Sequence, residues 1–328
     1  MKARIIPLLV LLLCLLSVSA GSHVPLPVAG GEGPDDAVLI QDPEKSWVVY
    51  DAIGEGGGVR YFRVEMEEGD ELRLSLFVPE QSPFTPDLLV IFPGDGGDPV
   101  PVPVPAGYTA ELIPGIYPKD PEFEPFTPSV LYPLAAYSRI IERPGTWYIA
   151  VREPSNGGKF GLAIGFREEF SPTEWLLVPI SVIGIHLWEG QSPLLIAAPF
   201  LAVILAALLF LQKRGTLKII GRSGPAMLGV AAGLLCLGSA GMVGAQMAMA
   251  LLRTGWTASA TVTFLFSLIP AVLGIAMVRA SRELSAGTGR TPGIKMGIWG
   301  VLALLFWAGF VAGPVLAIVS AALFLARR

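Results

Sequence analysis

The segment from Ser171 to Arg214 divides this chain into two parts of opposite character. Nearly every charged residue of the first half precedes it, and the apolar runs from Leu194 onward carry no charged side chain. Charged residues make up 15% of the chain, against roughly 25% in ordinary soluble domains. Because the deficit lies in the second half, the sequence predicts a soluble domain followed by a membrane domain.

The N-terminus has the pattern of a secretory signal peptide over residues 1–20. Lys2 and Arg4 precede an apolar core, and short side chains stand at Val18 and Ala20. We expect cleavage after Ala20, with an uncleaved signal anchor as the alternative. Either way, the following domain is expected outside the cytoplasm. Residues 21–37 are rich in glycine and proline and are expected to form a flexible linker.

Residues 38–170 have the pattern of an antiparallel β-sandwich. Leu72, Leu74 and Leu76 alternate with polar side chains directly after a Gly69-Asp70 turn, which predicts a hairpin with one buried face. Further short strand candidates, separated by Gly- and Pro-containing turns, follow as far as residue 167. Several short strands at this spacing favour two packed sheets.

The same stretch resembles the pre-peptidase C-terminal domain family, over about a third of the chain and here fused to a multi-pass membrane region. The matching motifs are Tyr61-Phe62, Gly69-Asp70, Leu72/Leu74/Leu76, Pro86-Asp87-Leu88, Gly145-Thr146-Trp147-Tyr148 and Phe160-Gly161-Leu162. The resemblance implies an extracellular jelly-roll-like sandwich that serves as a binding or accessory fold, with no catalytic residues to carry over. The chain departs from the family in a long insertion and in its membrane helices.

The insertion, residues 93–130, is rich in proline and is expected to be extended and semi-rigid. Its aromatic side chains are candidates for contact with a ligand or partner, and the alternative is that they fold back over an open end of the sandwich. Acidic residues in it lack the spacing of a calcium-binding loop, so no metal site is predicted. The aromatic candidates are Tyr108, Tyr117, Phe123 and Phe126.

Residues 171–190 predict a helix too short to span a bilayer, which needs about twenty apolar residues. Ser171 and Pro172 form a typical helix start. Trp175 and Trp188 stand near its ends and are expected to anchor it at the membrane interface. His186 within it is interpreted as a packing residue.

Four membrane spans are predicted over residues 194–211, 226–252, 257–278 and 296–326 of the membrane domain, residues 191–328. The loops after the first and third spans are strongly basic, so both are expected on the cytoplasmic side. This topology leaves the C-terminal Arg327-Arg328 outside, in conflict with that rule. A hairpin broken at Gly313-Pro314 is the alternative for the fourth span.

Glycines line the second span at spacings that let helices approach closely. Packing within the bundle is the alternative to a dedicated partner interface. The spans hold no Asp, Glu, Lys, Arg or His, which argues against a proton-coupled transporter or an intramembrane metal site. The candidate packing residues are Gly229, Gly233, Gly241 and Gly244.

The sequence therefore predicts a non-enzymatic multi-pass protein of the cell membrane that presents an exported β-sandwich for binding. The alternative is an accessory subunit of a membrane complex or transporter, whose helices pack against partner helices. We expect no cofactor. The expected partners are the lipid bilayer and other membrane proteins or envelope polymers. A net charge of −4 argues against nucleic acid.

Overall fold

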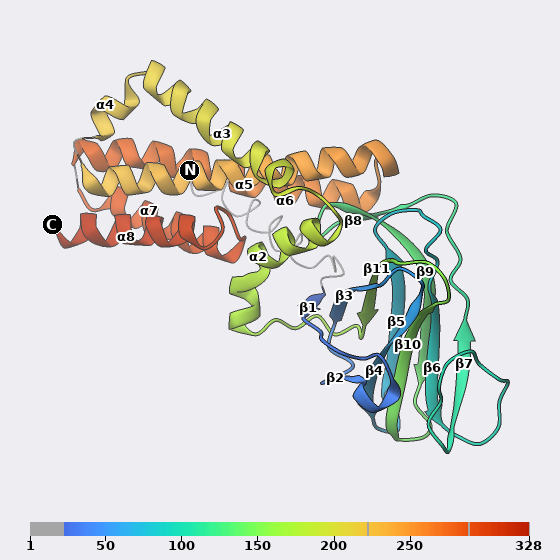
Figure 1. Cartoon of the computed structure of the whole chain (residues 1–328). Coiled ribbons are helices and arrows are strands. Elements are labelled where there is room, and N and C mark those ends of the chain that lie inside the picture. The colour runs from blue at the N-terminus through green and yellow to red at the C-terminus, as the bar shows by residue number, and fades with distance from the viewer. Residues whose placement is uncertain (1–22, 222, 288, 328) are drawn as a thin grey trace. The chain divides into compact units, whose positions relative to one another are not determined.

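A computed structural model describes residues 23–221, 223–287 and 289–327 of the chain. The predicted signal peptide, residues 1–20, lies outside the described residues. The chain forms two compact units (Figure 1). The β-domain comprises the described residues up to Phe126 and Val130–Ser171, and the helical unit comprises the described residues from Pro172 onward together with Thr127–Ser129. The predicted order, a β region followed by apolar helices, is confirmed.

The β-domain consists of two sheets. The six-stranded sheet has the order β1-β3-β11-β5-β9-β8, and the five-stranded sheet has the order β2-β4-β10-β6-β7. The pairs β1–β3 and β2–β4 are parallel, and the pairs β3–β11, β11–β5, β5–β9, β4–β10, β10–β6 and β6–β7 are antiparallel. The elements are β1 (Val24–Leu26), η2 (Pro34–Asp36), β2 (Val38–Ile40), β3 (Trp47–Ile53), β4 (Gly58–Met66), β5 (Glu71–Val78), β6 (Asp87–Pro93), β7 (Tyr108–Ile113), β8 (Glu122–Glu124), β9 (Ser129–Ile140), β10 (Gly145–Glu153) and β11 (Gly158–Ile164).

Burial alternates along the first part of β5, whereas β6 and β11 bury consecutive residues over Leu88–Ile91 and Phe160–Ile164. On β5 the three alternating leucines, Leu72, Leu74 and Leu76, are buried, and Arg73 is exposed on the opposite face. On β10 the ring of Trp147 is buried and stacks on a neighbouring phenylalanine. Strands β3 to β6 alternate between the two sheets, an arrangement that two-sheet jelly rolls share.

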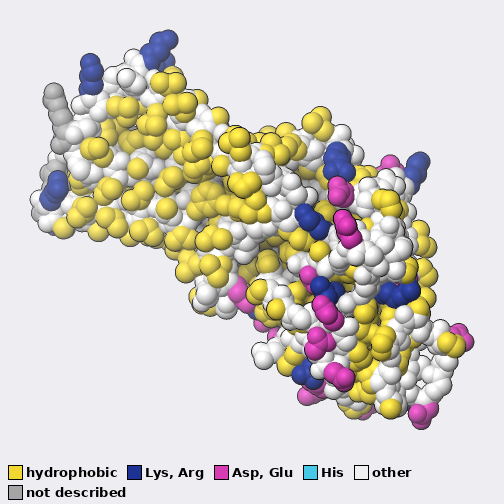
Figure 2. Space-filling view, in the orientation of Figure 1, with side chains coloured by type: hydrophobic (Ala, Val, Ile, Leu, Met, Phe, Trp, Pro, Cys, Tyr) yellow, Lys and Arg dark blue, Asp and Glu magenta, His cyan; other side chains and the backbone are white. Residues whose placement is uncertain are grey.

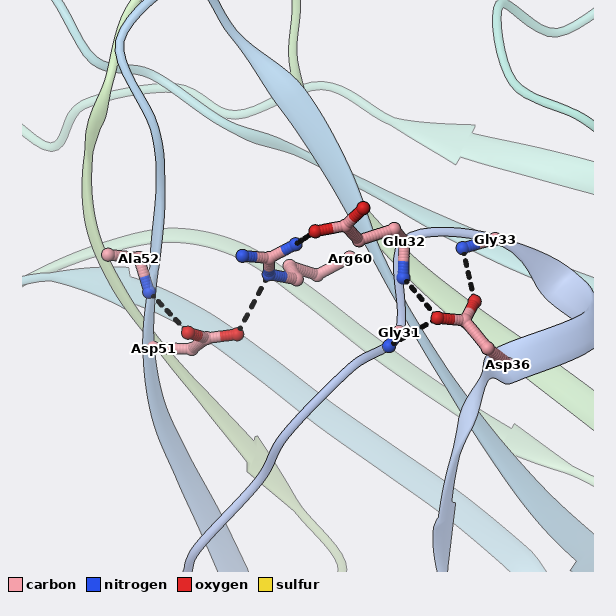
Figure 3. A network of polar contacts seen from close by, with 7 residues as sticks. All are labelled: Gly31, Glu32, Gly33, Asp36, Asp51, Ala52 and Arg60. Atoms are coloured by element: carbon pink, nitrogen blue, oxygen red, sulfur yellow. Dashed lines mark hydrogen bonds and ion pairs between the residues drawn. The ribbon is translucent and has the colours of Figure 1, made fainter.

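Residues 23–37 pack against the β-domain, although the composition of residues 21–37 predicts a flexible linker. β1 pairs with β3, and the Asp36 carboxylate accepts hydrogen bonds from the backbone N–H groups of residues 31–33 (Figure 3). The carbonyl of Gly31, a residue with φ of +83°, accepts the Tyr61 N–H at 2.6 Å. Arg60 beside it pairs with two carboxylates. Local hydrogen bonding by Asp thus fixes a segment that the sequence describes as loose.

The helical unit contains long apolar helices and several shorter ones. Its elements are α2 (Pro172–Trp188), α3 (Pro193–Lys213), α4 (Thr216–Ile220), α5 (Gly224–Thr254), α6 (Ala258–Ala286), α7 (Thr291–Leu305) and α8 (Ala312–Ala326). Ser192, Ser223 and Thr257 cap the starts of α3, α5 and α6 by accepting a backbone N–H.

Three helices of the described residues, α3, α5 and α6, are long and apolar enough to cross a membrane. The predicted four-helix bundle is therefore wrong in its count. The stretch expected as a fourth span, residues 296–326, is divided between α7 and α8, of 15 residues each. Each is about 22 Å long at 1.5 Å per residue, which is shorter than a bilayer core of about 30 Å.

The break between α7 and α8 is a tight turn over residues 306–311, ahead of the Gly313-Pro314 pair that the sequence offers as a break point. Trp307, Gly309 and Phe310 have φ values of 50°, 74° and 57°. The buried turn is held by α5, because Cys236 Sγ contacts the Ala308 carbonyl at 3.4 Å and the Gly309 N–H donates to a serine hydroxyl at 2.9 Å. These contacts satisfy backbone groups of the turn within the helical unit.

The hairpin returns the chain to the end of the helical unit from which α7 begins. Near the α7 start Gly293 faces Leu325 of α8, and the Ser320 hydroxyl donates to the Pro225 carbonyl at the α5 start at 2.6 Å. Arg327 consequently lies at the same end as the two basic loops (Figure 1). With residues 296–326 divided into a hairpin, the position of Arg327 no longer conflicts with the positive-inside rule.

Candidate binding site

A groove lies on the outer face of the six-stranded sheet, the face opposite the buried leucines of β5. Its floor is a row of small side chains, because Ser75 on β5 pairs with Ala163 on β11 and with Ala136 on β9. The groove has a volume of about 640 Å³. We call it the sheet groove, and its lining includes Arg73, Ser75, Ala136, Ser138, Ala163 and Phe166.

One wall of the sheet groove combines a fixed charge pair with an aromatic ring. The Arg73 guanidinium donates to both carboxylate oxygens of Glu71, at 2.6 and 3.1 Å, and lies 4.7 Å from the centre of the Phe166 ring. The Arg73 hydrogen bond, followed by one from the Ser138 hydroxyl, lowers the pKa of Glu71. The wall therefore holds an ion-paired guanidinium over an aromatic face.

The sheet groove also reaches a buried serine–histidine pair. Ser46 Oγ lies 2.5 Å from His23 Nδ1, and burial lowers the pKa of His23, so the ring is neutral near pH 7. Within the described ranges no carboxylate hydrogen-bonds His23, so the pair lacks the orienting acid of a serine hydrolase triad. The sequence does not predict this pair, because only the pairing of β1 with β3 brings Ser46 close to His23.

The four aromatic candidates of the insertion pack on different neighbours within the β-domain. Three are half-buried, and one is buried with 7% of its surface exposed. The Tyr117 hydroxyl is fixed by three backbone groups, accepting the Ser82 N–H and donating toward the carbonyls of Glu80 and Phe84. Tyr108 packs edge-on against Tyr148, Phe126 stacks on Phe170, and Phe123 is the buried residue.

The two tryptophans of α2 have different surroundings. Trp175 packs against Trp307 of the α7–α8 turn, with ring centres 4.2 Å apart, and its carbonyl accepts the Trp307 indole N–H at 2.8 Å. Trp188 is half-buried at the last residue of α2. The first therefore fixes α2 to the hairpin, and anchoring of either at a membrane interface stays a prediction.

The glycines of α5 divide by what they face. A side chain at Gly233 would meet the Gly274 carbonyl of α6 at 2.7 Å, and one at Gly241 would meet Val203 of α3 at 2.5 Å. Gly229 is enclosed by side chains of α6, α7 and α8. Gly244 is exposed and has no atom within 4 Å of that position. Three of the four thus serve packing within the unit.

A buried polar cluster joins the end of α2 to α5, and the sequence alone did not predict that its members meet. His186 Nδ1 lies 2.9 Å from Glu189 Oε2, and both side chains are at least nine-tenths buried. The amides of Gln191 and Gln246 donate to each other, at 2.9 and 2.8 Å. The reciprocal bonds satisfy the buried amide of Gln246 and the half-buried amide of Gln191, so the cluster fixes the end of α2 against α5.

The described residues hold no group of three His, Cys, Asp or Glu side chains that could bind a metal ion. Comparison with known proteins does not assign the chain to a family. No model of a known protein family matches the chain, and no curated protein matches it.

Proposed function

We propose that this chain is a non-enzymatic membrane protein that presents its β-domain outside the cytoplasm and binds a partner there through the sheet groove. The observation that carries the proposal is the groove itself. Small side chains on three adjacent strands form its floor, and Arg73 stands over an aromatic ring at its wall. Such a site receives an extended chain more readily than a compact ligand, so the proposed partner is a protein segment or an envelope polymer.

The distribution of charge supports the orientation. Figure 2 shows a mainly hydrophobic face on the helical unit, with Lys and Arg gathered at the end that holds α4, whereas both signs of charge occur on the β-domain. Arg327 and the loops around Lys213 and Arg290 all belong to the basic end. By the positive-inside rule that end is cytoplasmic, and a domain preceding α3 then lies on the outer side.

The relation of the β-domain to the pre-peptidase C-terminal family is part of the proposal. Its aromatic motif Tyr61-Phe62 lies on β4, and the Gly69-Asp70 turn connects β4 to β5. The Thr146-Trp147-Tyr148 motif lies on β10, between β4 and β6. These three motifs therefore occupy strands and a turn of the two sheets.

The proposal is tested by photo-crosslinking of the full-length protein in its own membrane. A photoreactive amino acid at Ala136, in the sheet groove, is compared with one at Arg63, an exposed position on the other sheet. We expect a discrete adduct from position 136 that a Ser75→Trp substitution removes, because the indole fills the groove. Equal adducts from both positions, or none from either, would overturn the proposal.

A second candidate function is that of an accessory subunit, and α3 favours it. Only 11% of the most apolar stretch of α3 is buried, which leaves a broad hydrophobic side for lipid or for partner helices. Its exposed residues include Leu194, Leu195, Leu201, Leu205, Leu209 and Phe210. Purification in mild detergent separates the two functions, since a stoichiometric membrane partner that Leu201→Trp releases would support the subunit role.

A further inference from the structure

A second cavity lies within the helical unit, between α3 and α6 above α5. It has a volume of about 410 Å³, within the range of roughly 300–1,000 Å³ typical of ligand sites. Ala207 from α3, Arg214 at the C-terminal cap of α3, Leu237 from α5, and Ile275, Arg279 and Arg282 from α6 line it. We call this cavity the helix cleft.

The helix cleft changes from apolar to basic along its length. On α6, Ile275 stands at the inner end and Arg282 at the outer end, about 10 Å apart at 1.5 Å per residue. Ala207 of α3 and Arg214, the residue that caps the C-terminal end of α3, have the same seven-residue separation and the same order. Because seven residues are close to two helical turns, each helix presents a single stripe that ends in arginine.

The basic end of the helix cleft carries uncompensated positive charge. In the described part of the chain none of its three arginines, at positions 214, 279 and 282, forms an ion pair with a carboxylate. Glu283, the neighbouring acid on α6, is paired with Lys295 at 2.8 Å.

Two hydrogen bonds with the short helix α4 hold the basic end of the helix cleft in position. The Arg282 guanidinium donates to the Thr216 hydroxyl at 2.7 Å, and the Ser285 hydroxyl donates to the Ile219 carbonyl at 2.7 Å. Arg214 lies over the ring of Phe210, with 5.3 Å between guanidinium carbon and ring centre. Two arginines are thus held in position before any ligand arrives, and Arg279 is exposed beside them.

We propose that the helix cleft binds an anionic phospholipid, with the phosphate against Arg214, Arg279 and Arg282 and an acyl chain along the apolar part. Guanidinium groups bind phosphate oxygens through paired hydrogen bonds. Basic pockets between membrane helices on the cytoplasmic side are suited to anionic head groups. An acidic peptide would satisfy the arginines but leave the apolar walls facing lipid, so the lipid accounts for both halves of the cleft.

The test uses full-length protein in mild detergent, titrated with phosphatidylglycerol or phosphatidylcholine and followed by native mass spectrometry. We expect tighter retention of phosphatidylglycerol. Arg214→Gln with Arg279→Gln should weaken it roughly thirtyfold, at about 1 kcal/mol per arginine. The matched control is Lys218→Gln, which removes a cation of α4 that does not line the cleft. We expect its affinity to stay within about twofold of the unsubstituted protein.

Two further measurements distinguish binding of a whole lipid from binding of a phosphate group alone. Ala207→Trp fills the apolar part without altering charge, and should also displace the lipid. Soluble glycerol phosphate should not compete, because it lacks the acyl chain. Equal losses in Lys218→Gln and the double variant would show diffuse surface attraction and overturn the proposal. Competition by glycerol phosphate, or full retention in Ala207→Trp, would overturn the lipid assignment. If the double variant unfolds, Arg279→Lys replaces it. The site would be refuted if Arg279→Lys left the affinity for phosphatidylglycerol unchanged and Ala207→Trp retained the lipid fully.

Discussion

The β-domain and the helical unit are both closely packed, but different kinds of side chain fill their cores. The β-domain fully buries large side chains such as Trp147, Tyr61 and Phe160. The helical core mixes small side chains with long flexible ones, and Ala232, Ala317, Met277 and Met296 are all fully buried where helices meet. A domain in water gains stability from the apolar area it removes from solvent. Helices in lipid gain little in that way and depend on close approach.

The largest expected effect is on the stability of the β-domain. Phe160 on β11 is fully buried, so Phe160→Ala should lower the free energy of unfolding of the β-domain by about 3–5 kcal/mol. The neighbouring Lys159 is exposed, and Lys159→Ala is the control. Urea denaturation of the full-length protein, followed by near-ultraviolet circular dichroism, measures both. Equal stability of the two variants would contradict burial as the source of stability.

The next effect tests the helical side. In Gly233→Ala the new methyl group would meet the Gly274 carbonyl at 2.7 Å, so α5 and α6 must separate. We expect a loss of about 1–3 kcal/mol. Gly244→Ala on the same helix meets no atom within 4 Å and should gain about 0.5–1 kcal/mol from improved helix propensity. Thermal unfolding in detergent compares them. Opposite signs are required, and a loss in both variants would refute selective packing at Gly233.

A smaller effect concerns the polar lock between α2 and α5. Gln246→Leu should cost about 1 kcal/mol, because the Gln191 amide loses its reciprocal partner in a buried site. The double variant Gln191→Leu, Gln246→Leu should cost less than the sum of the single variants. A double-mutant cycle on thermal unfolding measures this coupling, and strict additivity would show that the two amides do not act as a pair.

The smallest effect lies at the N-terminal segment of the β-domain. Backbone hydrogen bonds, first from Gly33 and then from Glu32, lower the pKa of Asp36. A carboxyl whose pKa is lower in the folded state contributes stability above its ordinary value near 3.8 and loses it as the pH falls through the folded pKa. Asp36→Asn should therefore speed amide exchange of residues 31–33 at neutral pH. The difference from the unsubstituted protein should vanish in acid, and a difference that persists there would exclude the charge as its cause.

Sequence patterns predicted the parts of the fold that repeat with a regular period. The leucine alternation of β5 and the apolar runs of α3, α5 and α6 are examples. They failed where backbone conformation depends on distant partners. The turn at Trp307–Phe310 depends on Cys236 and Ser239 of α5, and no local glycine–proline signal marks its position.

The two cavities could not be predicted from the sequence for the same reason. The sheet groove depends on strand register, which aligns Ala136, Ser75 and Ala163 from distant parts of the chain. The helix cleft depends on which faces of α3 and α6 meet above α5. Basic loops were visible in the sequence as orientation signals, but the convergence of Arg214 and Arg279 on one cavity was not.

Cysteine labelling of intact cells most directly tests whether the β-domain and the basic end of the helical unit lie on opposite sides of the membrane. Glu142→Cys places a thiol on an exposed loop of the β-domain, and Arg327→Cys places one after α8. The native Cys236 is buried and serves as an internal reference. With a membrane-impermeant maleimide we expect labelling at position 142 in intact cells and at position 327 only after lysis. Labelling at 327 in intact cells, or protection at 142, would contradict this arrangement.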